Sequence, residues 1–162
     1  MATLADDMVM ALDPVAFARD GLGFTPDTWQ TEALRWAGKR LMLNCCRQAG
    51  KSTIASILAL HRALYYPGAL VLLVSPSLRQ SGELFRKVAD LLAQLDHKPD
   101  LTEDNRLSLR LANGSRVISL PSKEGTIRGF SGVDLIIEDE SSRVPDDLYR
   151  ALRPKLAVSG GR

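Results

Sequence analysis

Residues 40–53, RLMLNCCRQAGKST, decide the fold of this chain. Residues 40–44 are largely apolar and predict a buried strand. From Lys51 onward, the side chains that would face a core recur at helical spacing, at Ile54, Ile57, Leu58, His61 and Leu64. The residues between strand and helix therefore have the setting of a phosphate-binding loop.

The connection matches the end of the phosphate-binding motif GxxxxGKS/T, with Cys45 in the place of the first glycine. In such a loop the backbone N–H groups surround the phosphates, the lysine reaches the outer phosphates, and the hydroxyl of Ser52 would bind Mg²⁺. The positive end of the helix dipole favours an anion at the same place. The sequence therefore predicts a nucleoside triphosphate site, and the alternative is a turn that contains GKS by coincidence. The candidate phosphate-binding residues are Arg47, Gln48, Ala49, Gly50, Lys51, Ser52 and Thr53.

The composition is typical of one soluble globular domain. The chain has 162 residues, of which 45% are hydrophobic and 25% are charged. Its net charge of +2 gives no global electrostatic argument for nucleic-acid binding. The two cysteines are adjacent and do not match a zinc site, which favours a reduced, cytoplasmic protein. No apolar run is long enough to span a bilayer, so we expect no membrane role.

Outward from the loop, helices and strands alternate. We expect helices over residues 1–23 and 27–37 before the loop. After the loop helix we expect a strand over residues 69–75 that is buried on both faces, followed by a helix capped by Ser77. This alternation predicts a parallel sheet flanked by helices.

A hairpin is expected near residue 113. Leucines alternate with polar residues before Asn113-Gly114, and this pair predicts a type I′ turn. Such a turn would place Leu109 opposite Ile118. The other side would carry Arg106 and Arg110, as a solvated polar face or as a contact with a phosphate backbone.

The second chemical signal is the segment of residues 133–140, VDLIIEDE. An apolar strand that ends in carboxylates suits phosphoryl transfer, in which one acid holds Mg²⁺ and another activates water. The preferred assignment gives the metal to Asp139 and the base to Glu140. The alternatives are Glu138 on the metal with Asp139 as the base, or a charged turn that closes a core strand.

From about residue 22 to its end, the chain resembles the N-terminal ATPase part of the large terminase subunit, the DNA-packaging motor of tailed bacteriophages. That family places Arg and Gln before GK, as residues 47–52 (RQAGKS) do, and its first motif position is often not glycine. Residues 24–30, FTPDTWQ, are similar to an adenine-recognising Q motif. In such a motif the amide of Gln30 would pair with adenine N6 and N7.

The resemblance implies a P-loop NTPase fold of the additional-strand (ASCE) type, an α/β fold whose mainly parallel, helix-flanked sheet carries an antiparallel hairpin. It also implies Mg²⁺-dependent hydrolysis of ATP, which would move double-stranded DNA into a procapsid. Implied partners are the DNA, the phage portal, the small terminase subunit and further copies of the chain in a ring, in the cytoplasm of a bacterial host. The alternatives are a helicase-like DNA-dependent ATPase and a nucleotide-binding terminase remnant without turnover.

An arginine is expected to act on the neighbouring subunit of the ring. Terminase motors are similar to other ring ATPases, in which such an arginine stabilises the charge on the transferred phosphoryl group. Arg47 and Arg128 are the candidates, and residues 126–129, TIRG, resemble a family signature. Arg128 is preferred, because Arg47 lies in its own loop and can act there. An ordinary surface ion pair is the alternative for Arg128.

Members of the family continue with a coupling-motif strand and a nuclease domain. We therefore expect residues 1–162 to be a truncated N-terminal ATPase domain that lacks both. In the implied sheet, the coupling strand lies between the strand of residues 40–44 and the acidic strand. We accordingly expect a gap in the sheet with unpaired strand edges on either side.

Overall fold

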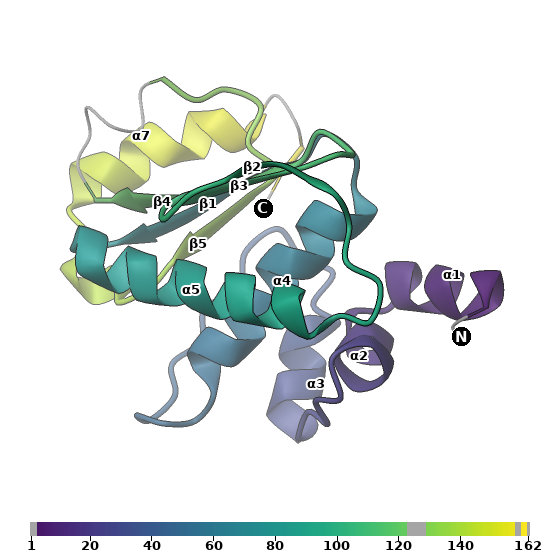
Figure 1. The fold of residues 1–162 in the computed structure, drawn as a ribbon. Coiled ribbons are helices and arrows are strands. Elements are labelled where there is room, and N and C mark those ends of the chain that lie inside the picture. Colours follow the sequence, from purple (N-terminus) through teal and green to yellow (C-terminus); the bar gives the residue numbers. More distant parts are fainter. Residues whose placement is uncertain (1–2, 123–128, 158–159, 162) are drawn as a thin grey trace.

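The computed structural model describes residues 3–122, 129–157 and 160–161. In this part of the chain a five-stranded sheet lies between two helical layers, with α4 and α5 on one face and α7 on the other (Figure 1). The helices are α1 (Leu4–Leu12), α2 (Pro14–Ala16), α3 (Thr28–Leu34), α4 (Lys51–Tyr65), α5 (Leu78–Gln94) and α7 (Asp146–Ala157), together with the π-helix η1 (Phe17–Gly21) and the 3-10 helix η2 (Ser141–Arg143). The strands are β1 (Leu70–Ser75), β2 (Leu101–Asp104), β3 (Ser108–Leu111), β4 (Arg116–Pro121) and β5 (Leu135–Glu138).

The strands lie in the order β2-β3-β4-β1-β5. β1 pairs in parallel with β4 and β5, and β3 pairs antiparallel with β2 and β4. All six residues of β1 are buried, as its apolar sequence LVLLVS predicts for a strand covered on both faces. The expected α/β fold, a helix-flanked sheet with an antiparallel hairpin, is therefore confirmed.

The side chains of β1 fill two cores on opposite faces of the sheet. Val71 and Leu73 pack with α4 and α5, whereas Leu70, Leu72 and Val74 pack with α7. This follows from strand geometry, because successive side chains point to opposite faces. The first of these cores holds α4 against the sheet and so positions the loop that precedes this helix.

The hairpin between β3 and β4 forms, but the expected register is wrong. Leu109 lies opposite Val117 instead of Ile118, because the turn has one residue more than a type I′ turn. The side chain of Asn113 stabilises the longer turn, since its Oδ1 accepts a hydrogen bond from the Ser115 N–H at 2.9 Å. A shift of one residue exchanges the two faces of a strand. Ile118 therefore packs in the core beneath α7.

The strand expected at residues 40–44 is also wrong, since this segment has no regular secondary structure. It leaves Leu41 40% and Met42 87% exposed, while Leu43 packs against the core. A strand requires a neighbour that pairs with its N–H and C=O groups. Within the described residues, β5 is an edge strand that pairs with β1, and residues 40–44 pair with no strand. An apolar pattern cannot supply that partner.

The end of α4 lies beside the amino ends of β1 and β4. Nδ2 of Asn113, just before β4, donates to the carbonyl oxygens of Ala63 and Leu64 at 2.9 and 3.0 Å. Ser115 Oγ donates to the carbonyl oxygen of Tyr66 at 2.9 Å. The 15 residues of α4 span roughly 22 Å, about the length of β1. The first turn of α4 is therefore directed toward the edge where β1 and β5 end.

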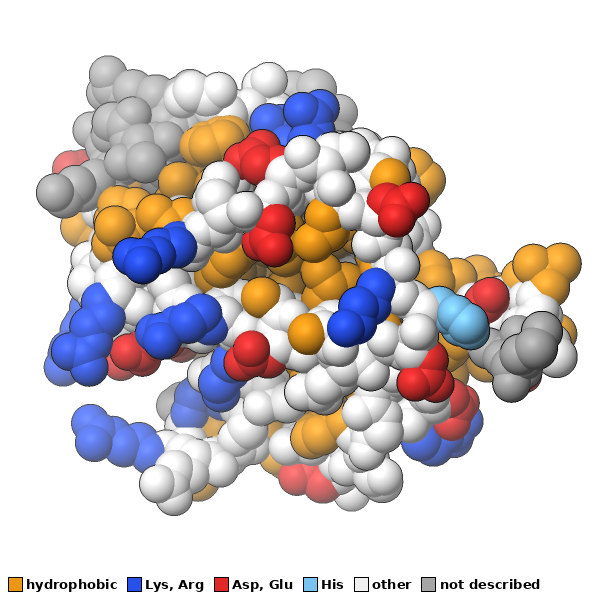
Figure 2. Space-filling view, in the orientation of Figure 1, with side chains coloured by type: hydrophobic (Ala, Val, Ile, Leu, Met, Phe, Trp, Pro, Cys, Tyr) orange, Lys and Arg blue, Asp and Glu red, His pale blue; other side chains and the backbone are white. Residues whose placement is uncertain are grey.

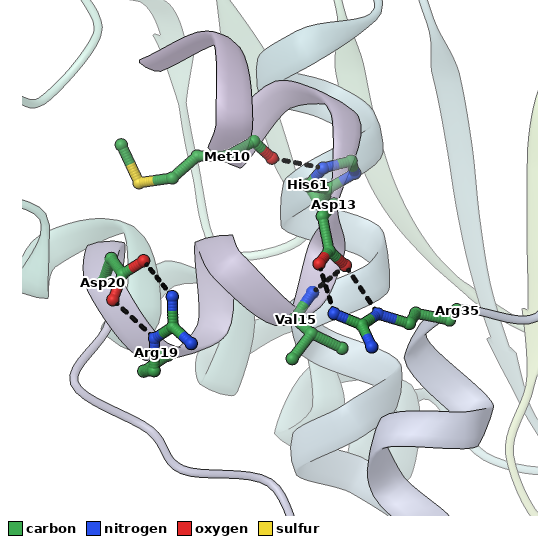
Figure 3. Close-up of polar contacts among 7 residues, drawn as sticks. All are labelled: Met10, Asp13, Val15, Arg19, Asp20, Arg35 and His61. Carbon is green, nitrogen blue, oxygen red and sulfur yellow. Dashed lines mark hydrogen bonds and ion pairs between the residues drawn. The ribbon is translucent and has the colours of Figure 1, made fainter. Parts of the chain in front are cut away.

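The N-terminal helices are attached to the α4 layer by polar contacts (Figure 3). The carboxylate of Asp13 accepts hydrogen bonds from the Val15 N–H at 3.0 Å and from the Arg35 guanidinium at 2.6 and 3.2 Å. The buried His61 of α4 donates its Nε2 hydrogen to the Met10 carbonyl at 2.9 Å, since a carbonyl oxygen only accepts. These contacts fix α1, α2 and α3 relative to the loop helix.

We expect Asp13→Asn to destabilise the protein by about 1 kcal/mol at neutral pH, because Arg35 loses its charged partner and is itself largely exposed. The Arg35 guanidinium, and to a smaller extent the Val15 N–H, lowers the pKa of the Asp13 carboxyl. A lowered pKa contributes stability above the pKa of the unfolded chain, and this is lost as the pH falls through the folded pKa.

Urea unfolding of wild type and Asp13→Asn measures this contribution. The difference between their unfolding free energies should be present at neutral pH and vanish in strong acid. The matched control is Asp20→Asn, whose partner Arg19 is adjacent in sequence and exposed. A difference that is the same at neutral and strongly acidic pH would contradict the assignment.

Candidate nucleotide-binding site

The turn before α4 has a backbone shape that exposes N–H groups. Gly50 caps the helix with φ of 87°, and Gln48 has φ of 62°. Left-handed values suit glycine, whereas at Gln48 this conformation costs about 1–2 kcal/mol. The first N–H groups of a helix have no partner inside it, and they form the positive end of its dipole. The loop therefore offers hydrogen-bond donors and partial positive charge to a ligand.

A pocket of about 270 Å³ opens at this turn. It is lined by Gln48, Ala49, Gly50, Lys51, Ser52, Thr53 and Lys87. The structure thus gathers the expected phosphate-binding residues from Gln48 onward around one cavity. Among the described residues, no carboxylate lines it. A cavity with two lysines, hydroxyls and a helix amino end suits an anion such as a phosphate.

The ammonium group of Lys51 is bonded to its own loop. Its Nζ donates to the carbonyl oxygen of Cys45 at 2.8 Å and to that of Cys46 at 2.6 Å. An ammonium has three N–H donors, so one is still available. A phosphate oxygen carries charge and accepts a stronger hydrogen bond than a neutral carbonyl. Lys51 is therefore positioned to exchange its loop contacts for contacts with a bound phosphate.

Gln30 braces the loop from α3. Its Oε1 accepts from the Asp27 N–H at 3.0 Å, and its Nε2 donates to the Ala49 carbonyl at 3.3 Å. The side chain is buried, and a Cβ atom at Gly50 would lie 2.8 Å from Nε2. Glycine at position 50 is therefore favoured by its backbone conformation, and a Cβ atom there would also displace the amide of Gln30. The brace was not expected from the sequence, which assigned Gln30 to the nucleotide base.

Glu138, the last residue of β5, and Asp139, which follows it, belong to two different faces of the sheet. The first and third residues of β5 pack in the core with α4, and the second packs in the core with α7. Alternation then assigns Glu138 to the α7 face and Asp139 to the face that α4 covers. The strand geometry extends to Asp139, because its N–H donates to the Val74 carbonyl at 2.9 Å.

The three carboxyl groups differ in their surroundings. Burial raises the pKa of the Glu138 carboxyl above its ordinary value. Asp139 Oδ1 accepts from the Glu140 N–H at 3.0 Å. Glu140 has φ of 51°, and its carboxylate lies 3.7 Å from the Arg143 guanidinium. Burial therefore disfavours the charged form of Glu138.

Other expected site residues do not join the pocket. Asp139 and Glu140 do not line it, and in the described ranges no three His, Cys, Asp or Glu side chains form a group that could hold a metal ion. Arg47 is exposed and likewise does not line it. Arg128 lies outside the described residues.

The pocket is also lined by Lys87 of α5, which no sequence pattern singles out. No motif marks it, because lysines are common on the polar face of an amphipathic helix. Packing of α5 against α4 brings it to the loop. The weak sequence signal is its place beside Leu84 and Val88, which belong to the buried stripe of α5.

The chain has relatives among known proteins. The family model described as terminase large subunit, T4likevirus-type, N-terminal, matches residues 42–160. The large terminase subunits of Thermus phage G20c and Thermus virus P23-45 are each 26% identical to it over 159 residues, which cover 86% of this chain and 33% of theirs. The chain thus spans about a third of the length of these curated relatives.

Solved structures have the same fold. The large terminase ATPase domain of Thermus phage P74-26 matches with a TM-score of 0.77 at 25% identity. An arginine-to-alanine mutant of that domain matches with a TM-score of 0.82 at 23% identity. Both matches cover 92% of this chain and 67% of the solved chain. Because the family model spans most of the sequence, the chain belongs to the T4-like family of large terminase subunits and corresponds to their N-terminal part.

Proposed function

We propose that this protein binds ATP with Mg²⁺ at the loop before α4 and hydrolyses it, and that the energy moves double-stranded DNA into a phage procapsid. The observation that carries the proposal is the acid-free pocket of about 270 Å³, which Lys51 and the amino end of α4 line. Membership of the terminase family supports ATP hydrolysis and DNA packaging as the activity of this site.

Different residues of the site would have different roles in phosphoryl transfer. Lys51 and the loop N–H groups would hold the phosphates, while Ser52 and Asp139 would hold Mg²⁺. A hydroxyl and a carboxylate are oxygen donors of the kind that Mg²⁺ prefers. Bound Mg²⁺ would neutralise charge on the β- and γ-phosphates. Glu140 would orient and deprotonate the attacking water.

The faces of β5 support Asp139 over Glu138 as the metal ligand. Asp139 belongs to the face that carries α4, and α4 carries the phosphate loop. Glu138 belongs to the opposite face, and burial raises the pKa of its carboxyl. These observations favour Asp139 and Glu140 as the functional pair.

The remaining parts of the proposal concern the assembled motor. Arg47 would act in its own site, and Arg128 would reach the site of the neighbouring copy in a ring. The partners would be double-stranded DNA, the phage portal and the small terminase subunit, in the cytoplasm of an infected bacterium. In the part of the chain that the structure describes, no helix combines the length and apolar character needed to cross a membrane.

The function is tested by measuring ATP binding and phosphate release by the purified protein. We expect saturable ATP binding, and phosphate release that requires Mg²⁺ and rises with double-stranded DNA. Single-stranded DNA of equal length is the control, because a helicase-like enzyme would respond to it. Binding without release under every condition would indicate a nucleotide-binding protein without turnover. Absence of ATP binding would contradict the proposal.

We further propose that Gln30 reads adenine in addition to bracing the loop. The oxygen and the nitrogen of its amide each make one hydrogen bond and each keep one further hydrogen-bonding position. We expect Gln30→Ala to weaken ATP binding about tenfold, because the variant loses both the brace to the loop and the contact with adenine. Inorganic tripolyphosphate, which has no base, should lose less affinity. Equal losses of affinity for ATP and for tripolyphosphate would show that Gln30 braces the loop and does not contact adenine.

A further inference from the structure

Lys87 lines the pocket at the start of α4, but it belongs to a different helix, α5. It lies in the middle of α5, and it lines the same cavity as the loop residues from Gln48 to Thr53. Figure 2 shows several Lys and Arg side chains gathered at the left of this face, around α5. Among the described residues of α5, Lys87 lines the pocket.

The packing of α5 determines where Lys87 lies. Leu84 and Val88 are buried in the core that α4 and α5 share. Lys87 follows Leu84 by three residues and precedes Val88 by one, so it flanks the buried stripe. A lysine in such a place can lay its methylene groups along apolar neighbours and keep its ammonium in water. The ammonium can therefore reach into the opening of the pocket.

Lys87 makes no ion pair of 4.0 Å or less with Glu83 or Asp90, the acids four residues before it and three residues after it on α5. Glu83, one turn earlier, lies 3.3 Å from the Arg79 guanidinium and 4.0 Å from that of Arg86. Within the described residues, Lys87 makes no ion pair of 4.0 Å or less and no carboxylate lines the cavity with it. Two lysines thus border a pocket without acids, and an anion between them would relieve their repulsion.

We propose that Lys87 is a second phosphate-binding lysine, whose ammonium contacts the polyphosphate of the bound nucleotide from α5. This inference rests on the proposed function of the loop. It assigns the pocket to nucleoside di- and triphosphates held from two helices.

The test compares ATP and ADP affinities of Lys87→Met, Lys87→Arg and wild type. Methionine keeps the packing of the side chain and removes its charge, and arginine keeps the charge. The matched control is Arg86→Met, which removes the same charge from the adjacent residue that lies near Glu83. We expect Lys87→Met to weaken binding about tenfold, a loss that shrinks as salt is added. Lys87→Arg and Arg86→Met should remain within about twofold of wild type.

Unchanged affinity in Lys87→Met, or an equal loss in Arg86→Met, would overturn the inference while leaving the nucleotide site in place. Equal losses of affinity in the two variants would mean that any positive charge on α5 promotes nucleotide binding. Failure of the wild type to bind ATP or ADP would instead overturn the proposed function, and the role of Lys87 with it. Urea unfolding of each variant checks that the affinities compare equally folded proteins.

Discussion

Replacing Lys51 by alanine should abolish measurable nucleotide binding, with a loss of affinity of at least about a hundredfold. Each charge-assisted hydrogen bond contributes roughly 1.5–3 kcal/mol, and the ammonium would make more than one with the outer phosphates. In the structure its Nζ is held 2.8 and 2.6 Å from two loop carbonyls, so the variant would also lose contacts that shape the loop.

Equilibrium titration with ATP measures the effect of Lys51→Ala. Lys98→Ala is the matched control, because Lys98 is exposed and lines a different cavity beyond the end of α5. Urea unfolding should show little change in stability. Cys46 is exposed, so water can replace the ammonium as the hydrogen-bond donor to its carbonyl oxygen. Wild-type affinity in Lys51→Ala would show that the pocket at the start of α4 is not the nucleotide site.

Replacing Glu140 by glutamine should lower the rate of ATP hydrolysis by about a hundredfold to ten-thousandfold while nucleotide binding is retained. The change removes the group that would accept a proton from water, and general-base catalysis contributes a factor of this size. The contact with Arg143 is 3.7 Å long and exposed, so its loss should hardly change stability.

Three variants distinguish the possible roles of the acids. Glu140→Gln should bind ATP with Mg²⁺ as wild type does and release phosphate slowly. Asp139→Asn should in addition weaken the dependence of ATP binding on Mg²⁺. Glu138→Gln should keep most of its turnover, because strand alternation places this side chain on the face of β5 opposite the one that α4 covers. Loss of turnover in Glu138→Gln with an active Glu140→Gln would transfer the metal to Glu138 and the base to Asp139.

Several segments could be predicted from the sequence because their signals are local. Ser77 caps α5 as expected, and its Oγ accepts from the Gln80 N–H at 3.3 Å. β1 could be recognised from an unbroken apolar run, which is typical of a strand with helices on both faces. The loop could be recognised from Gly50 and Lys51, since a left-handed cap and a lysine at fixed spacing are properties of a few adjacent residues.

The errors concern features that need a distant partner. Residues 40–44 have the composition of a strand, but pairing depends on a neighbouring strand at the right place in the sheet. The longer turn of the hairpin has a local hydrogen bond from the Ser115 N–H to Asn113 Oδ1, but Asn113 Nδ2 also donates to carbonyl oxygens at the end of α4. These distant partners cannot be detected in the residues of the segment itself.

The sequence by itself determined that a helix begins at Lys51 after a turn that contains Gly50, that an apolar strand is followed by Asp139 and Glu140, and that the fold is α/β. Only the tertiary structure decided that Gln30 braces Ala49, that Lys87 enters the pocket, and which face of β5 each acid occupies. The physical reason is how far apart in the sequence the interacting residues lie. Capping, helical spacing and strand alternation act between residues a few positions apart, whereas cavities and sheet partners arise where separate elements bury their apolar faces against one another.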